Sequence, residues 1–167
     1  NKSKLVTKYF RCILRLFFEL MNKILATVPA LVSISRTARD MPPETLAKIL
    51  NRDDILGLGE SYWQAVLQVP EQVLPRFEQA LAAGKTLEGH SAGASDKKLA
   101  AYVAGGISSC HEPINADQVL ERLRMGLHIM VREGSIRRDL AEIAKIKDTG
   151  IDLRRLILST DGVEPRD

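Results

Sequence analysis

The chain has 167 residues, of which 45% are hydrophobic and 27% are charged, and its formal net charge is +3. These values are ordinary for a globular protein of one domain, and they exclude a chain that is disordered throughout. Basic and acidic residues are interspersed beyond the N-terminal stretch, so no nucleic-acid partner is expected. The two cysteines, Cys12 and Cys110, are far apart and lack metal-type spacing, which predicts reduced thiols and a cytoplasmic location.

The N-terminal stretch, residues 1–23, mixes basic residues with Phe, Leu and Ile at helical spacing. Arg11, Arg15 and Glu19 fall four residues apart on one face. This pattern predicts an amphipathic helix that packs on the rest of the domain or, alternatively, lies on a membrane surface. Charges interrupt its apolar run, and the uncharged stretch 24–35 is too short to span a bilayer, so we expect neither a transmembrane helix nor a signal peptide.

From residue 24 to residue 167, apolar strand-like runs alternate with helical patterns. The expected strands are residues 24–32, 55–60, 86–90, 107–111, 127–133 and 154–161. The expected helices are residues 41–50, 70–85, 95–106, 115–126 and 135–150, with Gly84 as the C-terminal signal of the second and Asn115 as the N-cap candidate of the fourth. The strands are short, apolar and not alternating, which is typical of strands buried on both faces of a parallel sheet.

Two architectures fit this alternation, a doubly wound open sheet and a (β/α) barrel. The glycine fingerprint of a dinucleotide-binding fold is missing, because "GLGESY" lacks its third glycine. Four reactive residues end the expected strands: Glu60, His90, His111 and Asp161. Barrel enzymes build their active sites at this rim, so the fold predicted for residues 24–167 is α/β, a partial TIM-like (β/α) barrel. His128 begins its strand and is interpreted as structural.

The four strand-end residues offer the atoms that a catalytic divalent metal prefers, which are imidazole nitrogen and carboxylate oxygen. Each residue also has a simpler interpretation. A single strand-end histidine is commonly a hydrogen-bonded structural residue, and Glu60 and Asp161 could cap a helix or a turn. The combination of all four at one predicted rim favours a metal site.

The segments "VPA", "ILGLGE", "EGHSAGASDKKLAAYVAGGISSCHE", "MVREGS" and "LSTDG" occur in this order between Val28 and Asp167. In these motifs the chain resembles the adenine deaminase family of the amidohydrolase superfamily. The resemblance implies a distorted barrel of the metal-dependent hydrolase type that holds one or two divalent ions, Mn²⁺ or Fe²⁺ with Zn²⁺ as an alternative. It also implies purine metabolism, in which activated water attacks C6 of adenine and ammonia leaves to give hypoxanthine.

The resemblance also implies a role for each matching residue. Glu60 would be the carboxylate that binds or bridges the metals, and His90 and His111 would be further ligands. Asp161 would bind metal and shuttle a proton. Glu112 would touch the purine ring and assist proton transfer, which the departure of an amine requires.

The sequence departs from this family's pattern in several places. No His-x-His pair, expected at the end of the first barrel strand, occurs in the 167 residues. Gly162 and Cys110 stand where Asp is common, and Ser91-Ala92 stands where Ala-Pro is usual. The chain resembles the last five or six strands of a barrel, so we expect a fragment or truncated member that needs the missing strands or an oligomer partner.

Three functional classes remain open. The first is an adenine deaminase-like hydrolase, of which the isolated chain is expected to be inactive. The second is a catalytically inactive remnant that serves as a binding or structural module. The third is an amidohydrolase for another purine or a cyclic amide, because a fold and a metal site do not fix the substrate.

Overall fold

The computed structural model describes residues 25–30, 41–162 and 164, and these residues build a six-stranded parallel sheet. The strands follow one another in space in the order in which they occur in the chain. They are β1 (Ala26–Pro29), β2 (Ile55–Tyr62), β3 (Thr86–His90), β4 (Ser109–Cys110), β5 (His128–Arg132) and β6 (Leu156–Ser159). The N-terminal helix expected over residues 1–23 lies outside the described residues.

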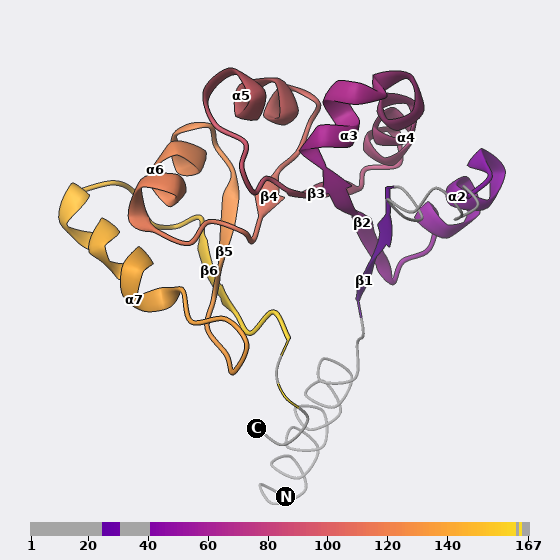
Figure 1. The fold of residues 1–167 in the computed structure, drawn as a ribbon. Coiled ribbons are helices and arrows are strands. Elements are labelled where there is room, and N and C mark those ends of the chain that lie inside the picture. Colours follow the sequence, from indigo (N-terminus) through magenta and orange to yellow (C-terminus); the bar gives the residue numbers. More distant parts are fainter. Residues whose placement is uncertain (1–24, 31–40, 163, 165–167) are drawn as a thin grey trace, which may run out of the picture.

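Helices connect consecutive strands and lie along the outside of the curved sheet (Figure 1). They are α2 (Pro43–Leu50), α3 (Trp63–Gln68), α4 (Pro70–Ala82), α5 (Asp96–Ala104), α6 (Ala116–Arg124), α7 (Leu140–Ile143) and the 3₁₀ helix η1 (Ala144–Thr149). None of the helices within the described ranges has the length and apolar character needed to cross a membrane.

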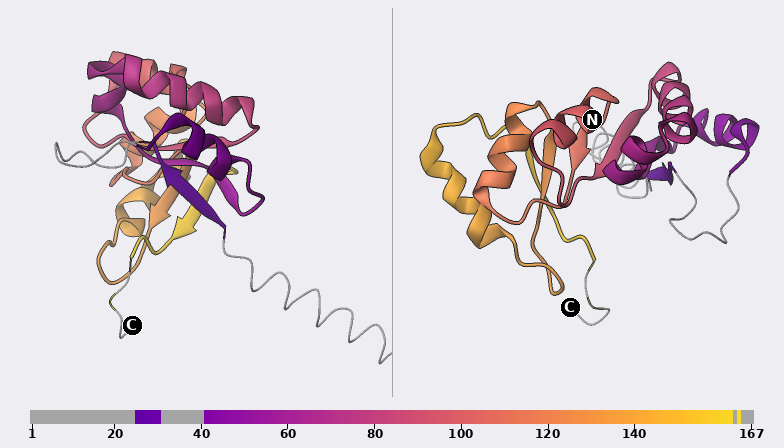
Figure 2. Two further views of the ribbon diagram at one scale, coloured as in Figure 1. Left: turned by 90° about the vertical axis from the view of Figure 1, so that its right-hand side faces the viewer. Right: turned by 45° about the horizontal axis from the view of Figure 1, so that its top comes forward.

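The strand order never reverses, which distinguishes this sheet from a doubly wound one. Right-handed crossovers between strands added in a single direction place every helix on the same face. The further views in Figure 2 show the same arrangement of helices and sheet. Within the described part of the chain, β1 and β6 pair on one side only, so the sheet is open. The α/β prediction is confirmed, and the topology is compatible with a partial (β/α) barrel.

The hydrophobic core lies between the sheet and its helices. Leu58, Leu87 and Ile129 contribute side chains from three strands, and Phe77 and Tyr102 pack onto them from α4 and α5; all five are at most 1% exposed. Burial of large apolar side chains of this kind stabilises a domain by about 1.5–3 kcal/mol per side chain. The core therefore fixes the strands and, with them, the loops at their carboxyl ends.

Local sequence signals explain two of the helix boundaries. Gly84 follows α4 with a φ of 70°, and the amide of Lys85 donates to the carbonyl of Ala80 at 2.9 Å, as in a Schellman motif. At the start of α6, the Asn115 side chain accepts a hydrogen bond from the amide of Gln118 at 3.0 Å. Both residues were expected at these positions from the sequence.

Several predicted boundaries were wrong. The helix expected over residues 135–150 begins only at Leu140, because the preceding residues form a loop. In this loop the amide of Gly134 donates to the carbonyl of Arg137 at 2.7 Å, and the amide of Asp139 donates to the carbonyl of Arg132 at 3.0 Å.

Three other differences affect the site. The strand expected over residues 107–111 is reduced to the two residues of β4, and β2 continues two residues beyond Glu60. The short helix α3, which follows β2 directly, was not anticipated. Its residue Trp63 contacts the loop after β3, so this missed helix contributes to the site described below.

Candidate metal site at the carboxyl edge of the sheet

The five residues singled out in the sequence lie at the carboxyl edge of the parallel sheet. Glu60 lies near the end of β2 and His90 is the last residue of β3. His111 and Glu112 directly follow β4, and Asp161 lies two residues beyond β6. Residues far apart in the chain therefore meet because parallel strands end at the same edge.

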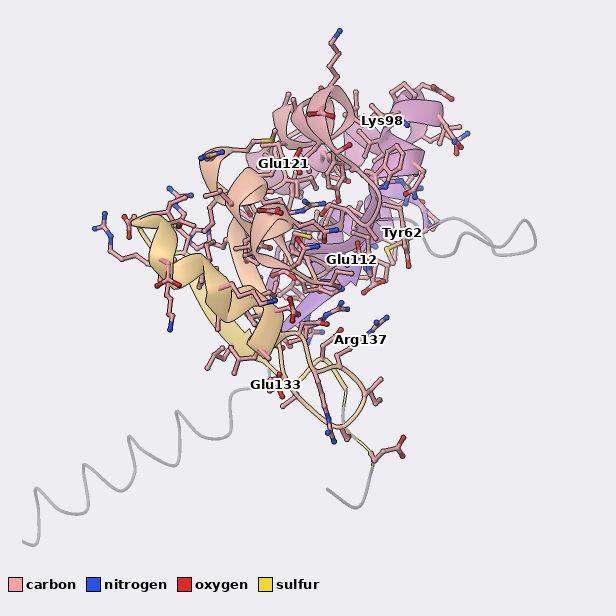
Figure 3. All side chains as sticks on the ribbon, turned by 60° about the vertical axis from the view of Figure 1, so that its left-hand side comes forward. Tyr62, Lys98, Glu112, Glu121, Glu133 and Arg137 are labelled. Carbon is pink, nitrogen blue, oxygen red and sulfur yellow. The ribbon has the colours of Figure 1, made fainter. Side chains whose placement is uncertain are left out.

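Three of these residues form a compact group that could hold a metal ion. One ligand atom from each of His90, His111 and Glu112 lies within 4.8 Å of the other two. The two imidazole rings meet edge to face with centroids 4.6 Å apart, and the ring of Tyr62 stacks on His90 at 4.5 Å. Figure 3 labels Tyr62 and Glu112 at this edge of the sheet.

Both carboxylate oxygens of Glu112 have partners. Its Oε1 lies 2.8 Å from Nδ1 of His90, and its Oε2 accepts a hydrogen bond from the amide of Ala92 at 2.6 Å. Burial opposes ionisation, but the bonds from His90 and Ala92 outweigh it and hold the pKa of Glu112 below its ordinary value. An ionised carboxylate only accepts hydrogen bonds, so the proton of the His90–Glu112 bond belongs to Nδ1.

The second ring nitrogen of His90, Nε2, lies 2.8 Å from Oε2 of Glu60. With Nδ1 protonated, a neutral ring would present a lone pair from Nε2 to a carboxylate oxygen. The two atoms attract one another only when a proton or a metal cation lies between or beside them. The hydrogen bond with Glu112 and the nearby carboxylates raise the pKa of His90, which favours the proton when no metal is bound.

The donor geometry of this pair therefore fits a divalent cation. With metal–ligand bonds of about 2.1 Å, two ligand atoms on one ion lie about 3.4 Å apart in a tetrahedral site and about 3 Å apart in an octahedral one, and the observed 2.8 Å between Nε2 and Oε2 is closest to the octahedral spacing. A carboxylate that fixes the other nitrogen of a ligating histidine is a common arrangement around metals. Glu112 is the carboxylate that fixes Nδ1 of His90 in this way.

The surroundings of His111 shift its pKa in the opposite direction from that of His90. Burial, together with the charge of His90, lowers the pKa of its imidazole, while the carboxylates of Asp161 and Glu112 oppose the shift. A lowered pKa favours the neutral ring, which is the form that binds a metal. The environment of His111 thus suits a ligand role.

Asp161 interacts with a residue that the sequence analysis did not single out. Nη1 of Arg132, at the end of β5, donates to Oδ2 of Asp161 at 3.0 Å, and its Nε donates to Oδ2 of Asp139 at 3.1 Å. Arg132 is only 6% exposed. A charged residue that ends an apolar strand was the signal that could have identified it.

A cavity of about 220 Å³ opens beside Glu112. Its lining combines small, apolar, polar and charged residues from the loops after β3, β4 and β5, from the end of β5 and from α6. These residues are Ala92, Gly93, Glu112, Ile114, Gln118, Arg132 and Arg137. Apart from Glu112, none of them was predicted as a functional residue from the sequence.

No protein-family model matches the chain. Comparison with curated proteins finds similarity to a protein named adenine deaminase from Cenarchaeum symbiosum, 40% identical over 165 residues, which is 95% of this chain and 27% of the relative. A protein of the same name from Moorella thermoacetica is 38% identical over 154 residues, 88% of this chain and 26% of the relative. A third, from Clostridium botulinum, is 33% identical over 141 residues.

The chain is thus homologous to adenine deaminases over most of its own length, and it spans about a quarter of the length of these relatives. The family expected from the sequence motifs is the family that the comparison finds.

Proposed function

We propose that this chain supplies part of the metal site of an adenine deaminase-like hydrolase, which converts adenine and water to hypoxanthine and ammonia. The observation that carries the proposal is the meeting of His90, His111 and Glu112 at the carboxyl edge of a parallel sheet in a chain homologous to adenine deaminases. The proposed metal ligands are His90 and His111 of this group together with Glu60 and Asp161, which lie outside it at the same edge of the sheet; Glu112 is proposed to hold His90 rather than to bind the metal.

One or two divalent ions at these ligands would supply Lewis acidity and lower the pKa of water. Nitrogen and oxygen donors suit Mn²⁺, Fe²⁺ and Zn²⁺ alike, so the proposal extends to all three. Glu112 orients the His90 ring through Nδ1, which directs Nε2 toward Glu60. Arg132 holds Asp161 at the same edge through its hydrogen bond.

The cavity beside Glu112 is the proposed place for the purine. Its volume of about 220 Å³ lies below the roughly 300–1,000 Å³ of pockets for drug-sized ligands, which suits a single small base. Attack of water on C6 releases one proton, and the departing amine must gain one. The carboxylates of Glu112 and Asp161 are the proposed carriers of that proton.

The proposed site is completed by groups beyond those of this chain. A His-x-His pair does not occur in its sequence, and in the part of the chain that the structure describes β6 pairs on one side only, with Leu158 70% exposed. Further barrel strands, from a longer polypeptide or a partner in an oligomer, would cover this edge and add ligands. The buried free thiol of Cys110 agrees with the proposed cytoplasmic location.

A second candidate function is a binding module without catalysis, and the missing His-x-His pair is the observation that favours it. A third is hydrolysis of another purine or a cyclic amide at the same site. Ammonia release from a series of purines by a completed enzyme separates the third candidate from adenine deamination.

The experiment for the proposal is to measure ammonia release from adenine by purified residues 1–167 with Mn²⁺, Fe²⁺ or Zn²⁺. It is then repeated after addition of a fragment of a homologous deaminase that carries the first barrel strands and the His-x-His pair. We expect activity only in the mixture, because the isolated chain lacks two ligands and part of the wall that positions the base. Metal-dependent turnover by the chain alone would contradict this expectation, and metal binding without turnover in any mixture would favour the binding module.

A further inference from the structure

Arg122, on helix α6, is one of the few charged residues buried in the described part of the chain, with 2% exposure. Its guanidinium donates to the loop that follows β3. Nε donates to Oγ of Ser91 at 2.9 Å, and Nη2 donates to the carbonyls of Ser91 at 2.9 Å and Ala94 at 3.1 Å. Nη1 binds the carbonyl of Gln118, one turn earlier in its own helix, at 3.1 Å.

The acceptors of Arg122 are mostly neutral. Among the described residues its ion-pair partner is Glu121, whose Oε2 lies 3.3 Å from Nη1 and whose side chain is 29% exposed. Desolvating a guanidinium is costly, and neutral carbonyls offset that cost less fully than a buried carboxylate would. The side chain therefore contributes fixed geometry to residues 91–94, since its planar donors hold several acceptors in one arrangement.

Residues 91–94 connect Arg122 with the proposed metal site. This loop begins directly after His90, and its Ala92 amide donates to Oε2 of Glu112 at 2.6 Å. The carbonyl of Ala92 accepts a bond of 2.7 Å from Nε1 of Trp63 on α3. The loop is thus held by α6 through Arg122 and by α3 through Trp63.

A second connection passes through the side chain of Ser91. Its Oγ accepts from Arg122 and also lies 2.7 Å from Sγ of Cys110, which is fully buried at the end of β4. The residue after Cys110 is His111. One guanidinium therefore reaches, through Ser91, the ends of both strands that carry the histidines.

We propose that Arg122 is a positioning residue for the metal site: it fixes residues 91–94 so that the Ala92 amide holds Glu112, and Glu112 in turn sets the orientation of His90. This inference rests on the proposed metal site but not on the identity of the substrate. It also accounts for a charged residue on the buried face of α6 that is not itself a lining residue of the cavity and, among the described residues, bonds to none of the proposed ligands.

If Arg122 had only a structural role, it would hold α6 against residues 91–94 without affecting the metal site. Two measurements on the 167-residue chain distinguish this role from the proposed positioning role. The first is the dissociation constant of Mn²⁺ by titration calorimetry. The second is the NMR chemical shift of the Ala92 amide proton, which reports its bond with Glu112. The variants are Arg122→Met and Arg122→Lys, with Val119→Ala as the control, because Val119 is fully buried on the same helix and makes no bond with the loop.

We expect the Mn²⁺ dissociation constant of Arg122→Met to rise by about tenfold or more, the usual effect of losing support around a ligand. The Ala92 amide signal should move upfield. Lys keeps the charge but replaces the planar guanidinium with a single ammonium, so Arg122→Lys should change the dissociation constant and the Ala92 amide shift in the same direction by smaller amounts. If Arg122→Met does not fold, Arg122→Lys is the variant to measure. Val119→Ala should lower stability while leaving the affinity and the amide signal unchanged.

Wild-type affinity and an unshifted Ala92 signal in either folded Arg122 variant would overturn the inference, as would equal changes in Val119→Ala. Absence of Mn²⁺ binding by the wild-type chain would instead contradict the proposed metal site. In that case the Ala92 signal alone decides whether Arg122 positions Glu112.

Discussion

Nδ1 of His90 lies 2.8 Å from Oε1 of Glu112, although 22 residues separate the two in the chain. This contact joins the ends of the neighbouring strands β3 and β4. It also means that the two nitrogens of the His90 ring have different partners. Nδ1 is held by Glu112, and Nε2 faces Glu60. The arrangement predicts that the two glutamates respond differently to the same substitution.

Glu112→Gln should weaken the binding of a divalent metal less than Glu60→Gln does, because its amide oxygen can still accept the bond from Nδ1 of His90 and only the bond from the Ala92 amide is lost. Turnover of a completed enzyme should fall by roughly 10²-fold, the usual scale for a positioned acid–base group. Glu60→Gln is the matched comparison and should weaken metal binding by at least about tenfold. Calorimetric titration gives the affinities, and equal losses in both variants would make Glu112 a ligand.

Gly89 should not tolerate a side chain. A Cβ atom at this position would lie 1.5 Å from the hydroxyl oxygen of Tyr102 and 2.8 Å from the carbonyl oxygen of Ser61. Gly89→Ala should therefore lower the free energy of unfolding by at least about 2 kcal/mol. Tyr102→Phe removes the nearest atom, so the double variant should lose less stability than the sum of the single ones, as urea unfolding would show. Strict additivity would mean that the strand moves away from Tyr102 instead.

Stability at high pH should depend on Tyr102, whose buried hydroxyl donates to the carbonyl of Ser61. Burial raises the pKa of Tyr102 far above its ordinary value. The unfolded chain loses this proton above a pH of about 10 while the folded chain keeps it, so the stabilisation is complete below that pH and declines above it. The decline should approach about 1.4 kcal/mol per pH unit. Tyr102→Phe should lack this component in denaturation curves between pH 9 and about 11, and an identical slope in both proteins would contradict the prediction.

The two carboxylates around Arg132 should contribute unequally to stability. The side chain of Asp139 is 13% exposed and that of Asp161 is 40% exposed. Asp139→Asn should lower the free energy of unfolding by about 1.5–3 kcal/mol, as for a buried bond to a charged group. Asp161→Asn should cost less than about 1 kcal/mol because water screens that pair. A larger loss for Asp161→Asn in urea unfolding would show that Asp161 has a mainly structural role.

Sequence reasoning predicted the fold through signals that act locally. The short apolar runs and the Gly84 and Asn115 boundary signals depend on neighbouring residues, and the structure confirms them. The start of α7 could not be predicted this way, because the loop before it is held by bonds between Arg132 and Asp139, which helical periodicity does not indicate. The start of α5, by contrast, was predicted to within one residue, although the structure adds a bond that the sequence did not show: the amide of Asp96 donates to Oε1 of Glu121, from another helix, at 2.8 Å.

In the candidate site, too, some features follow from local sequence signals and others depend on contacts between distant segments. Strand ends in a parallel sheet identified His90, His111 and Glu60 as neighbours before any geometry was known. The sequence did not reveal that Glu112 bonds to His90, or that Arg122 and Trp63 hold the loop between them, because these contacts join segments 22 to 31 residues apart. Motif spacing locates residues at an edge, and packing decides which atoms meet there.

The most direct test of the proposed metal site compares metal binding by two histidine variants of the 167-residue chain. His111 lies in the candidate ligand group, whereas His128 is the exposed first residue of β5, at the opposite end of the sheet from the site. We predict that His111→Ala raises the Mn²⁺ and Zn²⁺ dissociation constants by at least about tenfold, because one ligand is lost, and that His128→Ala leaves them unchanged. Equal affinities in the two variants and the wild type would contradict a metal site at the carboxyl edge of the sheet.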